Sequence, residues 1–322
     1  MSLRAEVSRY QAVWYLRSQL SSVFPSKVPA RWKEHHISSW ILNEHIFGQG
    51  TEPLIPKGSL ISLLMANINN EHSALGITMK DRDRDRVAEL CSNITLSRIV
   101  DPHVSSKAVD GVKIFRIDHK KGVITIQIPQ HLYERLSARH HVDILPLFLR
   151  YHTMGRLIDQ VRIPESLIRD IQSVVPLTGE LFSSFFNRVV DGLWFSMFPD
   201  IETQLGSSGS YFVSQIPSGT YIVNPPNDEF TLQQLSIKIV RDMKGASVLT
   251  YIIFIPSQSK HVECVAHSDY VRGSVKISDM MMYNPIHESH VSVGSYDVIV
   301  ASNDPVFSLE DEIISVLKRL RC

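Results

Sequence analysis

The sequence predicts an α/β fold that follows a helical N-terminal domain. As far as about residue 105, apolar residues recur at the three- and four-residue spacing of amphipathic helices. After residue 177, short apolar runs alternate with helical stretches, which indicates crossover units and a mainly parallel sheet buried on both faces. Because 322 residues exceed what one core usually holds, we predict a helical domain over residues 1–105 and an α/β core over residues 106–322.

The elements of the first half follow from the apolar period and from the prolines in the breaks. Helices are predicted over residues 8–24, 31–47, 60–68 and 83–99. Between residues 112 and 128 the period changes to two around a polar turn, which predicts a β-hairpin that leads into the core. Helical spacing then returns over residues 131–140, 144–158 and 164–175.

In the second half the two periods alternate. Strands are predicted over residues 177–183, 220–223, 248–255, 273–277 and 296–301. Helices are predicted between them over residues 188–198 and 230–243. Ser308 and Asp311 have the spacing of a capping box, which predicts that a final amphipathic helix begins there.

The composition excludes several classes of protein. Hydrophobic residues make up 43% of the chain and charged residues 20%, which is typical of a folded protein. The 33 basic and 33 acidic side chains cancel, so the net charge points neither to nucleic acid nor to a membrane. The three cysteines are far apart and form no C-x-x-C pair, so neither a disulfide scaffold nor a metal site is expected. No apolar stretch approaches the roughly 18 to 20 residues that cross a bilayer.

The start of the chain leaves two interpretations open. Its first twenty residues hold three arginines and one glutamate, an excess that a mitochondrial presequence also shows. Trp14 and Leu16 at helical spacing are equally typical of a helix that is docked on the domain.

The segment Asn224-Pro225-Pro226-Asn227 follows directly on a predicted strand. In open α/β sheets ligands bind outside the carboxyl ends of the strands, so a site is expected here. Two prolines fix φ and remove two N–H donors, which leaves stiff backbone with free carbonyls. The Asn224 oxygen and the Pro225 carbonyl can together accept both hydrogens of a planar amino group and orient its lone pair. A plain strand-ending turn is the alternative.

Further motifs keep a characteristic order around this segment. They are Glu180-Leu181-Phe182-Ser183-Ser184-Phe185-Phe186-Asn187, Phe198-Pro199-Asp200, Leu205-Gly206-Ser207, Phe254-Ile255-Pro256 and Asn303-Asp304-Pro305. In order and spacing, roughly residues 150–307 resemble the cap-specific adenosine N6-methyltransferases of the phosphorylated-CTD-interacting-factor family. The resemblance implies a Rossmann-like class I methyltransferase core that binds S-adenosylmethionine.

The resemblance also implies roles for individual residues. The catalytic positions, which clamp the target amine, are Asn224, Pro225, Pro226 and Asn227. The cofactor-binding positions are Glu180, Phe182, Ser183, Ser184 and Asn187 after the first core strand, Asp200 or Glu202 for the ribose hydroxyls, and Gly206 and Ser207 with Gly209 in a loop of close approach.

Two departures from the family pattern concern aromatic rings. Asn227 stands where adenine methyltransferases carry a ring that stacks on the base, an interaction worth about 1 to 3 kcal/mol. The family's proline after Ser184 is replaced by a bulky ring. By proximity in sequence, the candidates to replace the stacking ring are Phe185, Phe186 and Phe230.

The implied activity is methyl transfer from S-adenosylmethionine to the N6 amine of RNA adenosine, at the cap-proximal position of mRNA. Capped RNA and proteins of an RNA-processing complex are the implied partners, without a membrane, in the nucleus or the cytoplasm. One alternative is a catalytically inactive RNA-binding or scaffold subunit, which Asn227 favours. Another keeps the chemistry but changes the acceptor to glutamine or DNA adenine. All four tryptophans lie in predicted helical contexts, so no separate WW module is expected.

Overall fold

The chain forms two compact units, Met1–Ile158 and Asp159–Cys322. The computed structural model describes residues 2–48, 52–72, 78–94, 96, 101–119, 122–140, 143–155, 160–257 and 263–319. The division falls well after residue 105, so the hairpin belongs to the first unit, whereas the sequence predicts it with the second. Among the described helices, none combines the length and the apolar character that a bilayer span needs.

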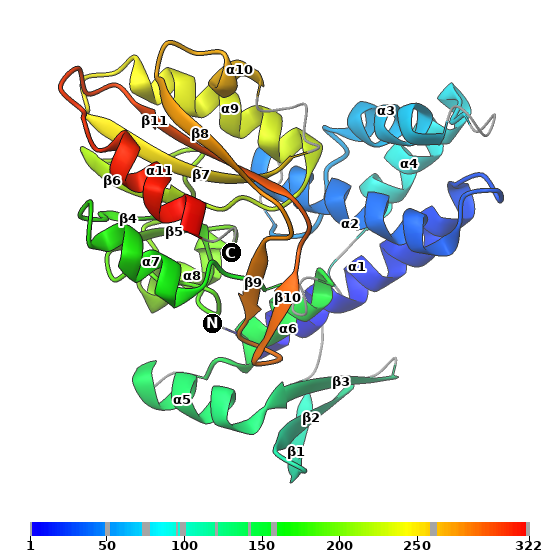
Figure 1. The fold of residues 1–322 in the computed structure, drawn as a ribbon. Helices are drawn as coiled ribbons and strands as arrows, with labels where there is room; N and C mark the ends of the chain where they lie inside the picture. The colour runs from blue at the N-terminus through cyan, green and yellow to red at the C-terminus, as the bar shows by residue number, and fades with distance from the viewer. Residues whose placement is uncertain are drawn as a thin grey trace. The chain divides into compact units, whose positions relative to one another are not determined.

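The first unit is built around its N-terminal helix (Figure 1). Its helices are α1 (Leu3–Val23), α2 (Ala30–Phe47), α3 (Ile61–His72), α4 (Asp81–Asn93), α5 (Gln130–His140) and α6 (Leu145–Thr153). The predicted helices are confirmed, although residues 95, 97–99 and 156–158 of the predicted stretches lie outside the described residues. Leu16 on α1 is fully buried, as expected of a docked helix, whereas Trp14 is 62% exposed.

A three-stranded antiparallel sheet completes the first unit. It contains β1 (His103–Val109), β2 (Val112–His119) and β3 (Gly122–Pro129), in that order. The β2–β3 pair confirms the predicted hairpin. Strand β1 has no predicted counterpart, because every one of its residues is exposed and the strand shows no apolar period. Its turn to β2 is Asp110-Gly111, two residues with positive φ, as a two-residue hairpin loop requires.

The second unit contains a six-stranded mixed sheet in the order β5-β4-β6-β7-β11-β8. The strands are β4 (Gly179–Ser183), β5 (Leu193–Ser196), β6 (Gly219–Val223), β7 (Leu249–Pro256), β8 (Val271–Ile277) and β11 (Tyr296–Ser302). The first four strands in this order are parallel, and β11 runs antiparallel to both its neighbours. The predicted strands and the mainly parallel ladder are confirmed. A separate pair, β9 (Met281–Asn284) and β10 (Ser289–Ser292), is antiparallel.

Helices cover both faces of this sheet (Figure 1). Helices α7 (Glu165–Gln172) and α11 (Glu310–Lys318) share one apolar core with Ile222 of β6. Helices α9 (Glu229–Met243) and α10 (Glu263–Ala266) share the other core with Val223, the next residue of the same strand. Neighbouring residues of a strand point to opposite faces, so β6 is buried on both sides.

Two predictions in the second unit are wrong. The predicted helix over residues 188–198 contains β5, whose Trp194 and Phe195 are buried as neighbours in a strand. Residues 184–192, which connect β4 to β5, hold turns and no helix. The predicted capping box at Ser308 is absent, because α11 begins one residue later, after an N-cap Leu309 that makes no side-chain cap.

Gly219, at the start of β6, lies where the side chain of any larger residue would clash with its neighbours. Its φ is +153°, and a Cβ atom there would lie 2.0 Å from Thr178 Oγ1. That hydroxyl accepts the N–H of Thr220. We expect Gly219→Ala to lower the free energy of unfolding by about 1 to 3 kcal/mol more than Gly122→Ala, measured by urea denaturation. Gly122 is the matched control because its φ is +148° and a Cβ atom there meets nothing within 4 Å. Equal losses would contradict the steric argument.

Candidate functional site

The strand order places a crevice between the carboxyl ends of β4 and β6. From β4 the chain pairs β5 on one side and then crosses back to pair β6 on the other side of β4. In open α/β sheets ligands bind where the strand order reverses in this way. The residues that follow the two strands, 184–187 and 224–226, therefore define the candidate site.

Strand β4 ends in a distortion at Phe182. This residue has φ +64°, which is rare for a side chain of its size. The register with β5 shifts between Glu180 and Ser183, which is the signature of a bulge. The Phe182 ring packs edge-on against Tyr211 and Phe212, with centroid distances of 5.7 and 5.3 Å. The bulge brings Glu180 and Ser183 onto the same side of the strand end, where their side chains hydrogen-bond.

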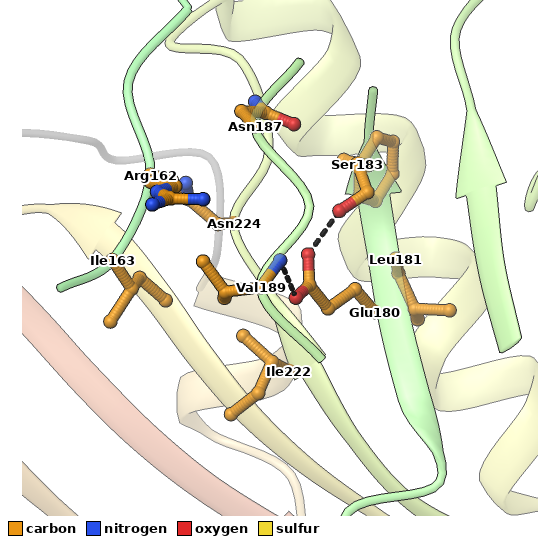
Figure 2. A pocket seen from close by; sticks show the side chains of 10 residues that line it. Arg162, Ile163, Glu180, Leu181, Ser183, Asn187, Val189, Ile222 and Asn224 are labelled. Carbon is orange, nitrogen blue, oxygen red and sulfur yellow. Dashed lines mark hydrogen bonds between the residues drawn. The ribbon is translucent and has the colours of Figure 1, made fainter. Parts of the chain in front are cut away.

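Glu180 is a buried carboxylate that holds the crevice together (Figure 2). Its Oε1 accepts the N–H groups of Val189, at 2.7 Å, and of Val190, and its Oε2 accepts the Ser183 hydroxyl. Burial raises the pKa of this carboxyl, and the hydrogen bonds and the charge of Arg188 offset the rise only in part. By accepting three hydrogen bonds in a buried position, Glu180 fixes the loop after β4.

The turn after β4 is closed by its own side chains. Asn187 Oδ1 accepts the N–H of Ser184 at 2.6 Å, and the Ser184 hydroxyl donates to Gln160 Oε1 at 2.6 Å. Glu202, which is fully buried, accepts the N–H of Phe185 at 2.8 Å. The polar side chains of this turn therefore already have partners within the protein.

The crevice contains a small cavity (Figure 2). It brings together five of the residues that the sequence predicts for the site, Glu180, Phe182, Ser183, Asn187 and Asn224. The remaining lining residues are Arg162, Ile163, Leu181, Val189 and Ile222. The cavity volume is about 10 Å³, which is room for roughly one water molecule.

The Asn-Pro-Pro segment leaves β6 as expected. Asn224 is half-buried and lines the cavity, and its side chain has no hydrogen-bond partner among the residues that the structure describes. Pro225 is buried, and the Pro226 carbonyl accepts the N–H of Asp228 at 2.9 Å. Asp228 then caps α9 by accepting the N–H of Thr231. Asn227 is exposed and does not line the cavity.

Four predicted cofactor-binding residues lie away from the cavity, alongside β5. Asp200 is exposed on the short helix α8 (Pro199–Glu202). The Glu202 carboxylate accepts the N–H of Phe185 in the turn after β4. Gly206 has φ +99° and ends the 3₁₀ turn Thr203–Leu205, and the Ser207 hydroxyl donates to Ser196 Oγ at 2.8 Å. The loop of Gly206, Ser207 and Gly209 thus pairs with the β5 strand end.

The three rings considered as stacking partners do not line the cavity either. Phe186 is buried, and Phe185 packs edge-on against it with a centroid distance of 5.9 Å. Phe230 is half-buried on α9. Among the described lining residues, Phe182 is the aromatic one.

Arg162 is the charged lining residue that the sequence analysis does not predict. It pairs with Tyr283 of β9 through an isolated bridge, and its guanidinium lies 5.0 Å from the centre of the Tyr283 ring. One terminal nitrogen donates to Glu165 at 2.6 Å. Its buried Nε has no hydrogen-bond partner among the residues that the structure describes. No local motif marks this arginine, because a strand more than a hundred residues away sets its position.

One comparison with known proteins finds a similarity over residues that include the candidate site. A family model described as phosphorylated CTD interacting factor 1 WW domain matches residues 130–285. No curated protein matches the chain. The matched residues include β4, β6 and the loops that follow them, but stop before β11. These residues are similar to that family.

The name of the matched family model does not describe the fold seen here. A WW module is a small three-stranded antiparallel sheet, whereas β4, β5, β6 and β7, all within the matched residues, form parallel ladders. Trp14, Trp32 and Trp40 lie on helices, as predicted, and Trp194 lies on β5, not in the predicted helix. The described tryptophans therefore do not sit in a WW-like sheet.

Proposed function

We propose that the second unit is an S-adenosylmethionine-dependent N6-methyltransferase of RNA adenosine, with the cap-proximal adenosine of mRNA as its target. The match to the phosphorylated CTD interacting factor family supports kinship, and the Asn-Pro-Pro segment supports the chemistry. Capped RNA and proteins of an RNA-processing complex are the proposed partners.

The observation that carries the proposal is the free side chain of Asn224 beside the cavity. Its oxygen is not used by any described residue, and it lies at the switch point of the sheet with Glu180 and Asn187. An amide oxygen and a neighbouring carbonyl accept both hydrogens of an exocyclic amine and turn its lone pair outward. Positioning of this kind, without a titrating base, supplies a large part of the rate enhancement of a group transfer.

The chemistry of the residues that line the cavity is compatible with S-adenosylmethionine, but the volume of the cavity is too small for it. Arg162 complements a carboxylate, whereas Glu180 and Asn187, which complement an ammonium group or a hydroxyl, are engaged by the turn after β4. Small-molecule sites, however, usually measure about 300 to 1,000 Å³, against the 10 Å³ found here. The cofactor does not fit the described arrangement, and its binding requires the turn closed by Asn187 to rearrange. We therefore assign no chemical step to the cofactor.

A second candidate function is favoured by this closed cavity and by Asn227. In it, the chain is a catalytically inactive methyltransferase-like protein that binds RNA or serves as a scaffold in a ribonucleoprotein. The exposed Asn227 offers no ring for an adenine, and none of the three nearby rings considered as substitutes lines the cavity.

Calorimetric titration of the full chain with S-adenosylmethionine separates the two candidates. Binding, together with methyl transfer to capped RNA and not to uncapped RNA, is the result we expect. Absence of binding up to millimolar cofactor would overturn the enzymatic proposal and favour the scaffold. Methylation of a glutamine or of DNA adenine instead of RNA would reassign the acceptor.

Replacement of Asn224 tests the amine clamp directly. We expect Asn224→Ala to lower kcat at least about a hundredfold, because a misplaced acceptor amine loses its alignment, while cofactor affinity changes little. Asn227→Ala is the matched control, since this neighbouring asparagine is exposed and off the cavity. Single-turnover methyl transfer measures both variants, and an equal loss in the two would contradict the assignment of the clamp to Asn224.

A further inference from the structure

The first unit contains a larger cavity that the proposed chemistry does not use. Its volume is about 340 Å³, within the usual range of small-molecule sites. It lies between α1 and the facing ends of β2 and β3, and all its described lining residues belong to the first unit. They are Tyr10, Gln11, Trp14, Tyr15, His119, Gly122 and Val123.

The cavity has an aromatic wall on one face of α1. Tyr10 and Trp14 are four residues apart, as are Gln11 and Tyr15, so the two pairs form adjacent rows on the helix. Trp14 is 62% exposed and Tyr15 is 47% exposed. Large rings that are gathered around a cavity and left open to solvent mark a binding surface more often than scattered ones do.

The floor of the cavity is polar, and hydrogen bonds hold its side chains in place. Gln11 is buried, and its amide hydrogen-bonds to His119 Nδ1 at 2.5 Å, which links α1 to β2. Tyr10 stacks on His152 of α6, with ring centroids 6.0 Å apart and planes 13° apart. A rigid polar edge beside open rings suits a flat ligand that has hydrogen-bonding groups on its rim.

Two kinds of ligand fit an aromatic cavity of this size, a flat nucleobase and an organic cation, and the charges of the lining residues distinguish them. No carboxylate is among the described lining residues, whereas aromatic sites for cations also gain from acidic neighbours. Arg17, on the next turn of α1, is not a lining residue and pairs with Glu34 at 4.0 Å. A lining without an acidic side chain favours a neutral flat ring over a cation.

We propose that this cavity binds the base of a nucleotide, with the ring stacked on Trp14 and Tyr15 and the base edge directed to Gln11 and His119. Base–aromatic stacking tolerates any base, because every base has a π-face, so selectivity rests with the polar edge. The proposal does not depend on methyl transfer, since the site lies in the other unit and shares no residue with the Asn224 cavity.

Titration of the full chain with AMP, GMP and UMP, followed by calorimetry, tests the proposal. We expect binding of at least one nucleotide, and Trp14→Ala should weaken it about tenfold or more. Trp14→Phe should retain most of the affinity. Trp32→Ala is the matched control, because Trp32 is also exposed but lies on α2, away from the cavity.

Three results would overturn the nucleotide site. They are no binding of any nucleotide, binding that Trp14→Ala leaves unchanged, and binding of tetramethylammonium in preference to the nucleotides. Because Trp14 is exposed, its truncation leaves the core intact, which a thermal melt of the variant checks. A chain that binds nucleotides through Trp14 but binds no S-adenosylmethionine would overturn the methyltransferase proposal and support this one, so the two failures are distinguishable.

Discussion

Replacement of Glu6 by alanine is expected to remove about 3 to 5 kcal/mol from the free energy of unfolding of the first unit. Arg150 of α6 is fully buried, and Glu6 of α1 is 2% exposed. The Arg150 Nε and Nη2 atoms donate to the two oxygens of Glu6 at 2.7 and 2.9 Å. Without the carboxylate, the buried guanidinium loses this charged partner, and the cost of weaker compensation in a buried position, more than the lost attraction, sets the size of the effect.

Urea denaturation measures this loss, and an exposed ion pair supplies the control. On β2, the Arg116 Nε atom lies 3.1 Å from Asp118 Oδ1, and the two side chains are 62% and 38% exposed. Arg116→Ala should cost at most about 1 kcal/mol, because solvent screens such pairs. The double replacement Glu6→Met with Arg150→Met should recover much of the loss, since an apolar pair of similar volume carries no buried charge. A Glu6→Ala cost no larger than that of Arg116→Ala would contradict the argument.

The success of the secondary-structure prediction depended on burial. Strands β6 and β7 are buried on both faces and read as continuous apolar runs, so their positions follow from the sequence. Strand β1 is exposed throughout and has no such signal. Strand β5 is a four-residue run next to a charged turn, and its apolar spacing is equally compatible with a helix. Short buried runs are the case in which periodicity cannot separate the two.

The residues of the candidate site also fall into two groups, those that the sequence places correctly and those whose positions depend on tertiary contacts. Glu180, Asn187 and Asn224 could be grouped from sequence, because the carboxyl ends of parallel strands meet at one edge of a sheet. Glu202 and Ser207 were expected beside them, but they instead pair with the turn after β4 and with the end of β5. Arg162 reaches the cavity through its bridge to Tyr283, a tertiary contact without any local signature.

Replacement of Glu180 by alanine is expected to lower the free energy of unfolding of the second unit by about 2 to 6 kcal/mol. The carboxylate accepts the N–H groups of Val189 and Val190, and each buried donor that loses its acceptor costs about 1 to 3 kcal/mol. Glu180→Gln keeps an acceptor oxygen for these donors, so its cost should be much smaller. Urea denaturation of the two variants at pH 7 checks the difference, and equal costs would show that the N–H groups find other partners.

The same carboxyl also gives the second unit a pH dependence whose sign follows from its burial. Burial raises the pKa of Glu180 above the ordinary 4.5, so the folded state holds this proton more tightly than the unfolded state. Stability from this group is then greatest below the ordinary pKa and declines as the pH rises through the raised pKa. Glu180→Gln cannot titrate, so stability relative to the parent chain should increase over this pH range. A difference between the two chains that stays flat from about pH 4 to pH 7 would show that the three hydrogen bonds to the carboxylate cancel its desolvation and leave the pKa unshifted.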